Sequence, residues 1–284
     1  MPVYVSTGAF KNKSLKSILQ DAGKNHITHI ELSAGLNYLD DVEALLKSHC
    51  NDISYLIHNY FPTPKEPFVL NLASEDSYIV GKSMDMCKRA IDMAARYKIP
   101  FYSVHSGFAF DSKGKELGNE SQLKLPRISI QTAKENFIKN LAGVCKYAKE
   151  KEVKIAIENN VFAGYAKGYD GLYLGVTEAD LLEIINNVPY DNLGILLDLA
   201  HAKVSCKSLK TNVIEMINML KPYILCVHAS QNDGIVDSNS KIGKNDDVYN
   251  YLKMIKPKYV VVEVYNLDIC EIKQQVALVQ EAIQ

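Results

Sequence analysis

Short apolar runs alternate with helical patterns along the whole chain. The runs are rich in Val, Ile and Tyr, and each precedes a polar loop and then a stretch with apolar residues at helical spacing. This alternation is typical of a parallel βα repeat. Strands are expected at residues 3–7, 28–32, 54–58, 101–105, 153–158, 193–198, 223–228 and 259–263. Helices are expected at residues 15–22, 40–47, 78–97, 130–149, 178–186, 210–220, 247–255 and 269–282. The pattern predicts an α/β fold, a (β/α)8 TIM barrel built as a single domain over residues 1–284.

Length and composition agree with this prediction. The 284 residues are 47% hydrophobic, which is enough for one sizeable core. A formal net charge of -1 gives no general electrostatic reason to expect nucleic acid or an anionic membrane as a partner. The cysteines form no CxxC pair, so neither a thiolate zinc site nor a dithiol redox centre is indicated. Because the amino terminus lacks a secretory pattern and no apolar run is long enough to cross a membrane, we expect a cytoplasmic protein.

Metal-binding types of side chain stand at the downstream ends of six of the expected strands. A parallel barrel gathers the carboxyl ends of its strands at one rim, so residues far apart in sequence are expected to meet there. Three carboxylates and one imidazole come from the last four strands, a mixed oxygen and nitrogen set that suits Mn²⁺, Mg²⁺, Co²⁺ or Zn²⁺. Burying several carboxylates without a cation is costly, which favours a divalent metal ion over a purely polar network. The six residues are His58, His105, Glu158, Asp198, His228 and Glu263.

Two further residues near the expected rim have several interpretations. His201 follows Asp198 by three residues, and a second metal ligand, a substrate contact and a structural hydrogen bond all remain open. Glu31 ends an early apolar run and faces the same rim, where a structural ion pair is at least as good an interpretation as a functional one.

Three long connections are expected beside this rim. Residues 106–127 form the longest irregular stretch, and long loops in compact domains are often functional. Residues 159–175 interleave glycines with Tyr165, Tyr169 and Tyr173, a composition suited to covering a small polar ligand. Residues 58–74 contain three prolines, which restrict the backbone and favour a fixed wall.

The chain resembles the xylose-isomerase-like barrel superfamily, which includes sugar isomerases and epimerases, inosose dehydratases and apurinic-site endonucleases. The resemblance spans essentially the whole chain and implies a metal ion held by Glu158, Asp198, His228 and Glu263. It also implies that Glu158 and Glu263 move a proton next to a carbonyl group through an enediolate, which the metal ion stabilises. We therefore expect an isomerase or epimerase of carbohydrate metabolism that acts on a small sugar or sugar phosphate. The chemistry leaves open whether copies of the chain assemble with one another.

The endonuclease branch of the superfamily is the main alternative. It resembles this chain in having further ligands where His58, His105 and His201 stand, and Asp237 matches the Asp of its Asp-x-His pair. Asn239 replaces the His of that pair, and an amide oxygen is the poorer zinc ligand.

The arginines also argue against this branch. They occur only at Arg89, Arg96 and Arg127, in or beside expected outer helices, so no phosphate clamp is visible. Action on abasic DNA is therefore the less favoured reading. A metal-binding barrel without turnover is a third. In the isomerase reading, a second metal ion or the substrate is expected to contact His58, His105, His201, Asn232, Asp237 and Asn239.

Overall fold

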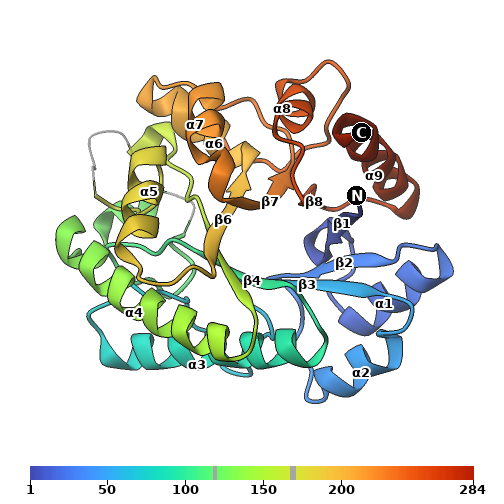
Figure 1. The fold of residues 1–284 in the computed structure, drawn as a ribbon, viewed down its shortest axis with the longest axis horizontal. Coiled ribbons are helices and arrows are strands. Elements are labelled where there is room, and N and C mark those ends of the chain that lie inside the picture. Colours follow the sequence, from blue (N-terminus) through green and yellow to red (C-terminus); the bar gives the residue numbers. More distant parts are fainter. Residues whose placement is uncertain (118–119, 167–170) are drawn as a thin grey trace.

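Eight parallel strands close into a barrel in which each strand pairs with the next along the chain and β8 pairs with β1 (Figure 1). The computed structural model describes residues 1–117, 120–166 and 171–284. The predicted TIM barrel is confirmed, and every strand ends within one residue of its expected bounds. The strands are β1 (Val3–Ser6), β2 (His29–Leu32), β3 (Ser54–His58), β4 (Phe101–His105), β5 (Lys154–Glu158), β6 (Leu193–Asp198), β7 (Ile224–Ala229) and β8 (Tyr259–Val262).

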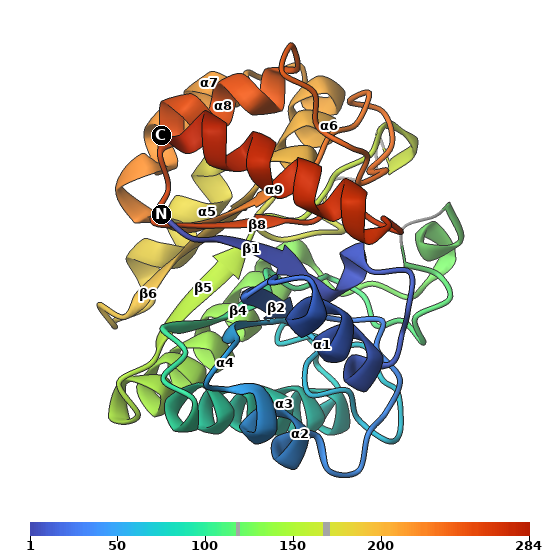
Figure 2. The ribbon, with the colours of Figure 1, turned by 90° about the vertical axis from the view of Figure 1, so that its right-hand side faces the viewer.

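Helices surround the barrel and bury the outer faces of its strands (Figures 1 and 2). Strand residues such as Leu56, Val104 and Ile157 are fully buried, as expected of parallel strands covered on both faces. The last helix packs against β1, so the two ends of the chain lie close together (Figure 2). In the described ranges the α-helices are α1 (Leu15–Lys24), α2 (Val42–His49), α3 (Ser77–Arg96), α4 (Ile130–Glu150), α5 (Glu178–Asn187), α6 (Leu199–Leu209), α7 (Val213–Leu220), α8 (Asp247–Ile255) and α9 (Ile269–Ile283).

The segment after β6 differs from the expectation of one helix over residues 210–220. It forms two helices, because α6 begins directly after the strand, with the Asp198 side chain accepting a hydrogen bond from His201 N (2.6 Å). Lys210 ends α6 in the left-handed conformation (φ 59°), and Asn212 caps α7. Asp198 therefore stands at a junction where strand, cap and helix follow one another without a loop.

Two of the long connections pack against each other beside the rim. Their apolar side chains form a second, smaller core that includes Phe110, Phe162 and Leu172. Backbone pairing ties them together, because Ala109 N donates to Leu172 O (2.9 Å). Tyr169, expected in the covering loop, lies outside the described residues. No helix within the described ranges has the length and apolar character needed to cross a membrane.

Candidate metal and acid-base site

The four side chains from the last four strands converge at the carboxyl-terminal rim. Glu158 ends β5, Asp198 ends β6, His228 lies in β7, and Glu263 follows β8 directly. Each offers one ligand atom, and these atoms all lie within 4.8 Å of one another. All four residues are buried, with exposed fractions between 0% and 8%. The barrel register contributes to the convergence, since Asp198 and His228 are direct partners on neighbouring strands.

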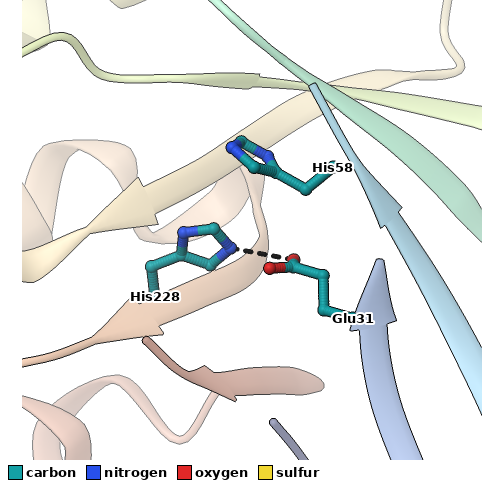
Figure 3. A group of neighbouring side chains, drawn as sticks. All are labelled: Glu31, His58 and His228. Carbon is teal, nitrogen blue, oxygen red and sulfur yellow. Dashed lines mark hydrogen bonds and ion pairs between the residues drawn. The ribbon is translucent and has the colours of Figure 1, made fainter. Parts of the chain in front are cut away.

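Glu31 fixes the orientation of His228. The Glu31 Oε2 atom lies 2.9 Å from His228 Nε2, and both side chains are fully buried (Figure 3). When Nε2–H donates to this carboxylate, Nδ1 is the ring nitrogen that faces the rim. Nδ1 lies 2.8 Å from Glu263 Oε2 and 3.4 Å from Glu158 Oε1. A carboxylate behind the distal ring nitrogen is the usual support of a metal-binding histidine.

Three polar atoms of this centre have ion-pair contacts but make no well-directed hydrogen bond to any described residue. They are Glu158 Oε2, Asp198 Oδ2 and His228 Nδ1, and each of these atoms is buried. Buried polar atoms in proteins nearly always make a good hydrogen bond, so three atoms gathered here without one call for a missing partner. A divalent cation fits the set, because it pairs with carboxylate oxygen and imidazole nitrogen together.

Asn159 supports this centre and was not singled out from the sequence. Its side chain accepts from Asp198 N (2.7 Å) and donates to Asp198 O (3.0 Å). Its own backbone oxygen lies 2.9 Å from His201 Nδ1. Asn159 is fully buried and holds the end of β6 in place next to β5.

The electrostatic environment shifts the pKa values of the cluster in opposite directions. Burial raises the pKa of Asp198 to about 8. Burial also acts to raise the pKa of Glu158, but His105, His58 and His228 together hold it well below its usual range. Burial acts to lower the pKa of His228, which Glu31 and Glu263 nevertheless raise well above its usual range. Metal ligands bind in deprotonated form, so a cation entering this site would displace protons.

A second group shares Glu158 with the first. Its Oε2 atom lies 3.3 Å from His58 Nε2 and 3.1 Å from His105 Nδ1. His58 Nδ1 lies 3.0 Å from the Ser103 hydroxyl, which bonds in turn to the Ile57 carbonyl. Burial lowers the pKa of His58 to about 3, so its ring is neutral and has a lone pair to offer. Glu158, His58 and His105 are therefore able to hold a second cation.

His201 and Asp237 form a third polar pair at the rim. His201 Nε2 lies 3.2 Å from Asp237 Oδ2, and Asp237 Oδ1 is buried with no hydrogen-bond partner among the described residues. Burial acts to lower the pKa of His201, but Asp198 and Asp237 raise it well above its usual range. A protonated His201 beside Asp237 has both ring N–H groups satisfied.

Asn232 and Asn239, also candidates from the sequence, make hydrogen bonds to the backbone. Asn232 Nδ2 donates to Ala200 O (2.9 Å), and its Oδ1 accepts from Gly234 N (2.9 Å). Asn239 Nδ2 donates to Glu263 O (3.1 Å). In this arrangement both side chains brace the loop after β7.

A polar cavity of about 280 Å³ opens onto the centre. Its lining includes Glu263, His58 and His105 from the two groups described above. It also includes Lys13 and Tyr265, neither of which was selected from the sequence. The only sequence signal for Tyr265 is its position two residues after Glu263. The cavity places a small polar molecule against the Glu263 carboxylate.

Comparison with known proteins gives consistent matches to this fold. The family described as xylose isomerase-like TIM barrel matches residues 19–284. A protein of Methanocaldococcus jannaschii without assigned function is 23% identical over 256 residues, 89% of this chain and 77% of its own.

Solved structures similar to the chain establish the fold alone. A D-tagatose 3-epimerase-like protein is 22% identical, with 100% of this chain and 97% of that chain covered and a TM-score of 0.74. D-psicose 3-epimerase of Clostridium cellulolyticum is 12% identical, with 100% and 98% covered and a TM-score of 0.69. Further similar structures include other sugar epimerases and a family 2 AP endonuclease.

Proposed function

Because the chain belongs to the xylose isomerase-like TIM barrel family, we propose that it is a divalent-metal-dependent isomerase or epimerase of a small sugar derivative. One observation carries the proposal. The carboxylates of Glu158 and Glu263 meet at one buried centre beside a polar cavity. In the sequence they are separated by β6 and β7, because Glu158 ends β5 and Glu263 follows β8. The names of similar structures, which are sugar epimerases, support a carbohydrate as the substrate.

Glu158, Asp198, His228 and Glu263 would hold the cation. When bound, a divalent cation supplies Lewis-acid stabilisation for the negative charge that develops on a substrate oxygen. Glu31 keeps His228 turned toward the centre, and Asn159 keeps Asp198 there.

Glu158 and Glu263 would move the proton. The pKa of Glu158 is held well below its usual range and the pKa of Glu263 is also lowered, by His228 against the effect of burial, so both are carboxylates that can accept a proton. Removal of a proton by one carboxylate and its return from the other face inverts a carbon, which is epimerisation. Return to the neighbouring carbon, together with transfer of the hydroxyl proton from one oxygen to the other, gives isomerisation. His105 borders the cavities beside this centre and would orient a substrate hydroxyl group. His201 borders one of them and would hold Asp237 in place.

The test is proton exchange with solvent. Metal-loaded protein is incubated with a panel of ketoses in D₂O, and NMR follows deuterium entering the carbon next to the carbonyl. Glu263→Gln should lower the exchange rate by roughly 10²–10⁴-fold, because a proton carrier is lost. Glu215→Gln, an exposed change on α7, is the matched control and should leave the rate unchanged. Exchange at the wild-type rate in Glu263→Gln would refute the role of that residue, and no exchange with any ketose would refute the proposed activity.

The second potential cation group is a specific observation in favour of a nuclease. His58, His105 and Glu158 are able to hold another cation, as a multi-metal phosphodiesterase requires. Against it, the Asn239 amide is engaged by the Glu263 backbone and offers no imidazole. A duplex with one abasic site, incubated with zinc and then with chelator, separates the two functions. Cleavage that needs zinc would favour the nuclease, and we expect none.

A further inference from the structure

The polar cavity at the metal centre continues into a larger apolar cavity of about 330 Å³. The two share Ala34, Asn59 and His105 in their walls, so one ligand can occupy both. A free small sugar would fill the polar part only. Water would then contact the apolar walls of the other part, and such contact is unfavourable in free energy.

Three tyrosines line the apolar cavity, and each of their hydroxyl groups accepts a hydrogen bond from another part of the protein. Their main contribution to the cavity wall is therefore the apolar surface of the ring. The Tyr60 hydroxyl accepts from Phe68 N (2.7 Å). The hydroxyl groups of Tyr165 and Tyr173 both accept from the Gln122 side-chain amide. With Phe68 and Phe108, these rings form a wall that matches an apolar group of ring size.

The side-chain amide nitrogen of Asn160, which also lines this cavity, is engaged by backbone oxygens. Asn160 Nδ2 donates to Gly107 O (2.9 Å) and to Leu174 O (2.9 Å). Leu70, Val69 and Leu117 add further apolar surface. The polar groups that stay available lie toward the metal centre, at His105 and Asn59.

Asn59 marks the junction of the two cavities. Its Oδ1 atom is buried and has no hydrogen-bond partner in the part of the chain that the structure describes. Its backbone has a positive φ of 45°, and it is fixed by hydrogen bonds from Asn59 N to Ser103 O (2.6 Å) and from the Tyr102 hydroxyl to Asn59 O (2.8 Å). The Oδ1 atom can therefore accept a hydrogen bond from a sugar hydroxyl group. Its position at the junction places that hydroxyl group where the polar half of a ligand would end.

We propose that the substrate is a keto sugar derivative that carries a ring-sized apolar substituent, such as an aryl ether or ester, with its carbonyl-bearing sugar at the metal centre and its substituent in the apolar cavity. This substrate class presupposes the sugar-directed activity proposed above. Asn59 would separate the two halves by binding a hydroxyl group of the sugar.

The experiment measures binding without turnover. Phenyl and methyl β-D-glucopyranoside differ only in the substituent, and neither has a free carbonyl group to react. Calorimetry or ligand-observed NMR on the metal-loaded protein should show that the phenyl probe binds roughly tenfold or more tightly than the methyl probe, through burial of the ring.

Filling the cavity should remove this preference. Val69 and Leu117 line the apolar cavity but not the polar one, so Val69→Phe and Leu117→Phe should each bring the phenyl probe down to the affinity of the methyl probe. Ile214→Phe, on the exposed face of α7 and 46% exposed, adds a ring away from both cavities and should keep the preference. Thermal melting of each variant verifies that it is folded.

Equal affinity for the two probes, or no detectable phenyl probe binding at millimolar concentration, would overturn the proposal. So would a preference that persists in both folded filling variants. If the preference is found but no ketose exchanges deuterium, the assignment of the apolar cavity stands and the proposed isomerase function fails. If deuterium exchanges but the preference is absent, the proposed isomerase function stands and the assignment of the apolar cavity fails.

Discussion

Replacement of Glu31 tests whether the metal centre depends on a residue that would not touch the metal. Glu31→Gln keeps the size of the side chain and one acceptor oxygen, but it removes the charge that faces His228 Nε2 at 2.9 Å. Both groups are fully buried, so water cannot take over the interaction. A hydrogen bond to a charged group contributes about 1.5–3 kcal/mol. Loss of such a supporting residue usually weakens metal binding about 10–100-fold, or about 1.4–2.7 kcal/mol, and the two ranges agree.

The assay is competition for Mn²⁺, Co²⁺ or Zn²⁺ between the protein and a fluorescent chelator. Glu215→Gln, exposed on α7, is the matched control and should bind the metal like the wild type. Glu31→Ala should bind at least as weakly as Glu31→Gln. If Glu31→Gln keeps its metal affinity within about twofold while the alanine variant loses it, Glu31 acts by packing or by an uncharged hydrogen bond, and the reasoning from charge is refuted.

Three further predictions concern stability. Burial raises the pKa of Asp198 to about 8, so the metal-free folded state holds more protons than the unfolded chain between about pH 4 and 8 and should lose stability as the pH rises. Asp198→Asn, whose Oδ1 can still cap α6, should flatten this dependence in melts without metal, and an unchanged slope would contradict the assignment. Chelation should lower the melting temperature, since a site loaded at about 100 times its Kd contributes about 2.7 kcal/mol, and equal melting curves with and without metal would exclude tight binding. Asn159→Ala removes two buried hydrogen bonds to Asp198 and should cost about 1–3 kcal/mol in urea unfolding, whereas a loss below about 0.5 kcal/mol would show that the bonds are dispensable.

The strand pattern could be predicted from the sequence because buried parallel strands leave a clear signal. Runs such as residues 155–157 are apolar and stop at a polar residue, here Glu158, where the rim begins. Helix α6 could not be found in the same way. It starts directly after Asp198, so no turn residue separates strand from helix, and most of its first half is buried. A buried helix and a buried strand look alike in a short apolar run.

The proposed metal ligands could be predicted from the sequence better than the residues that hold them in place. Glu158, Asp198, His228 and Glu263 share a position, the end of a strand, and that position can be read from the sequence. Asn159 looks like any loop residue, and its role depends on the register that sets β5 beside β6. The partner of Glu31 lies 197 residues away, so only closure of the barrel brings the two together.

Glu158 connects the two functions that this centre can support, because its Oε1 atom faces His228 while its Oε2 atom faces His58 and His105, so the residue belongs to both potential cation groups. A carboxylate with both oxygens engaged by cations would be a poor acceptor for a carbon-bound proton. If Asp198, His228 and the two glutamates held one cation, Oε2 of Glu158 would stay available for proton transfer, and His58 and His105 would face the substrate. If the second group held a cation as well, Glu158 would serve to hold both cations, which suits phosphodiester chemistry better than epimerisation. The number of cations bound under working conditions therefore discriminates between the two activities, and it can be measured by metal analysis of the purified protein before any substrate is known.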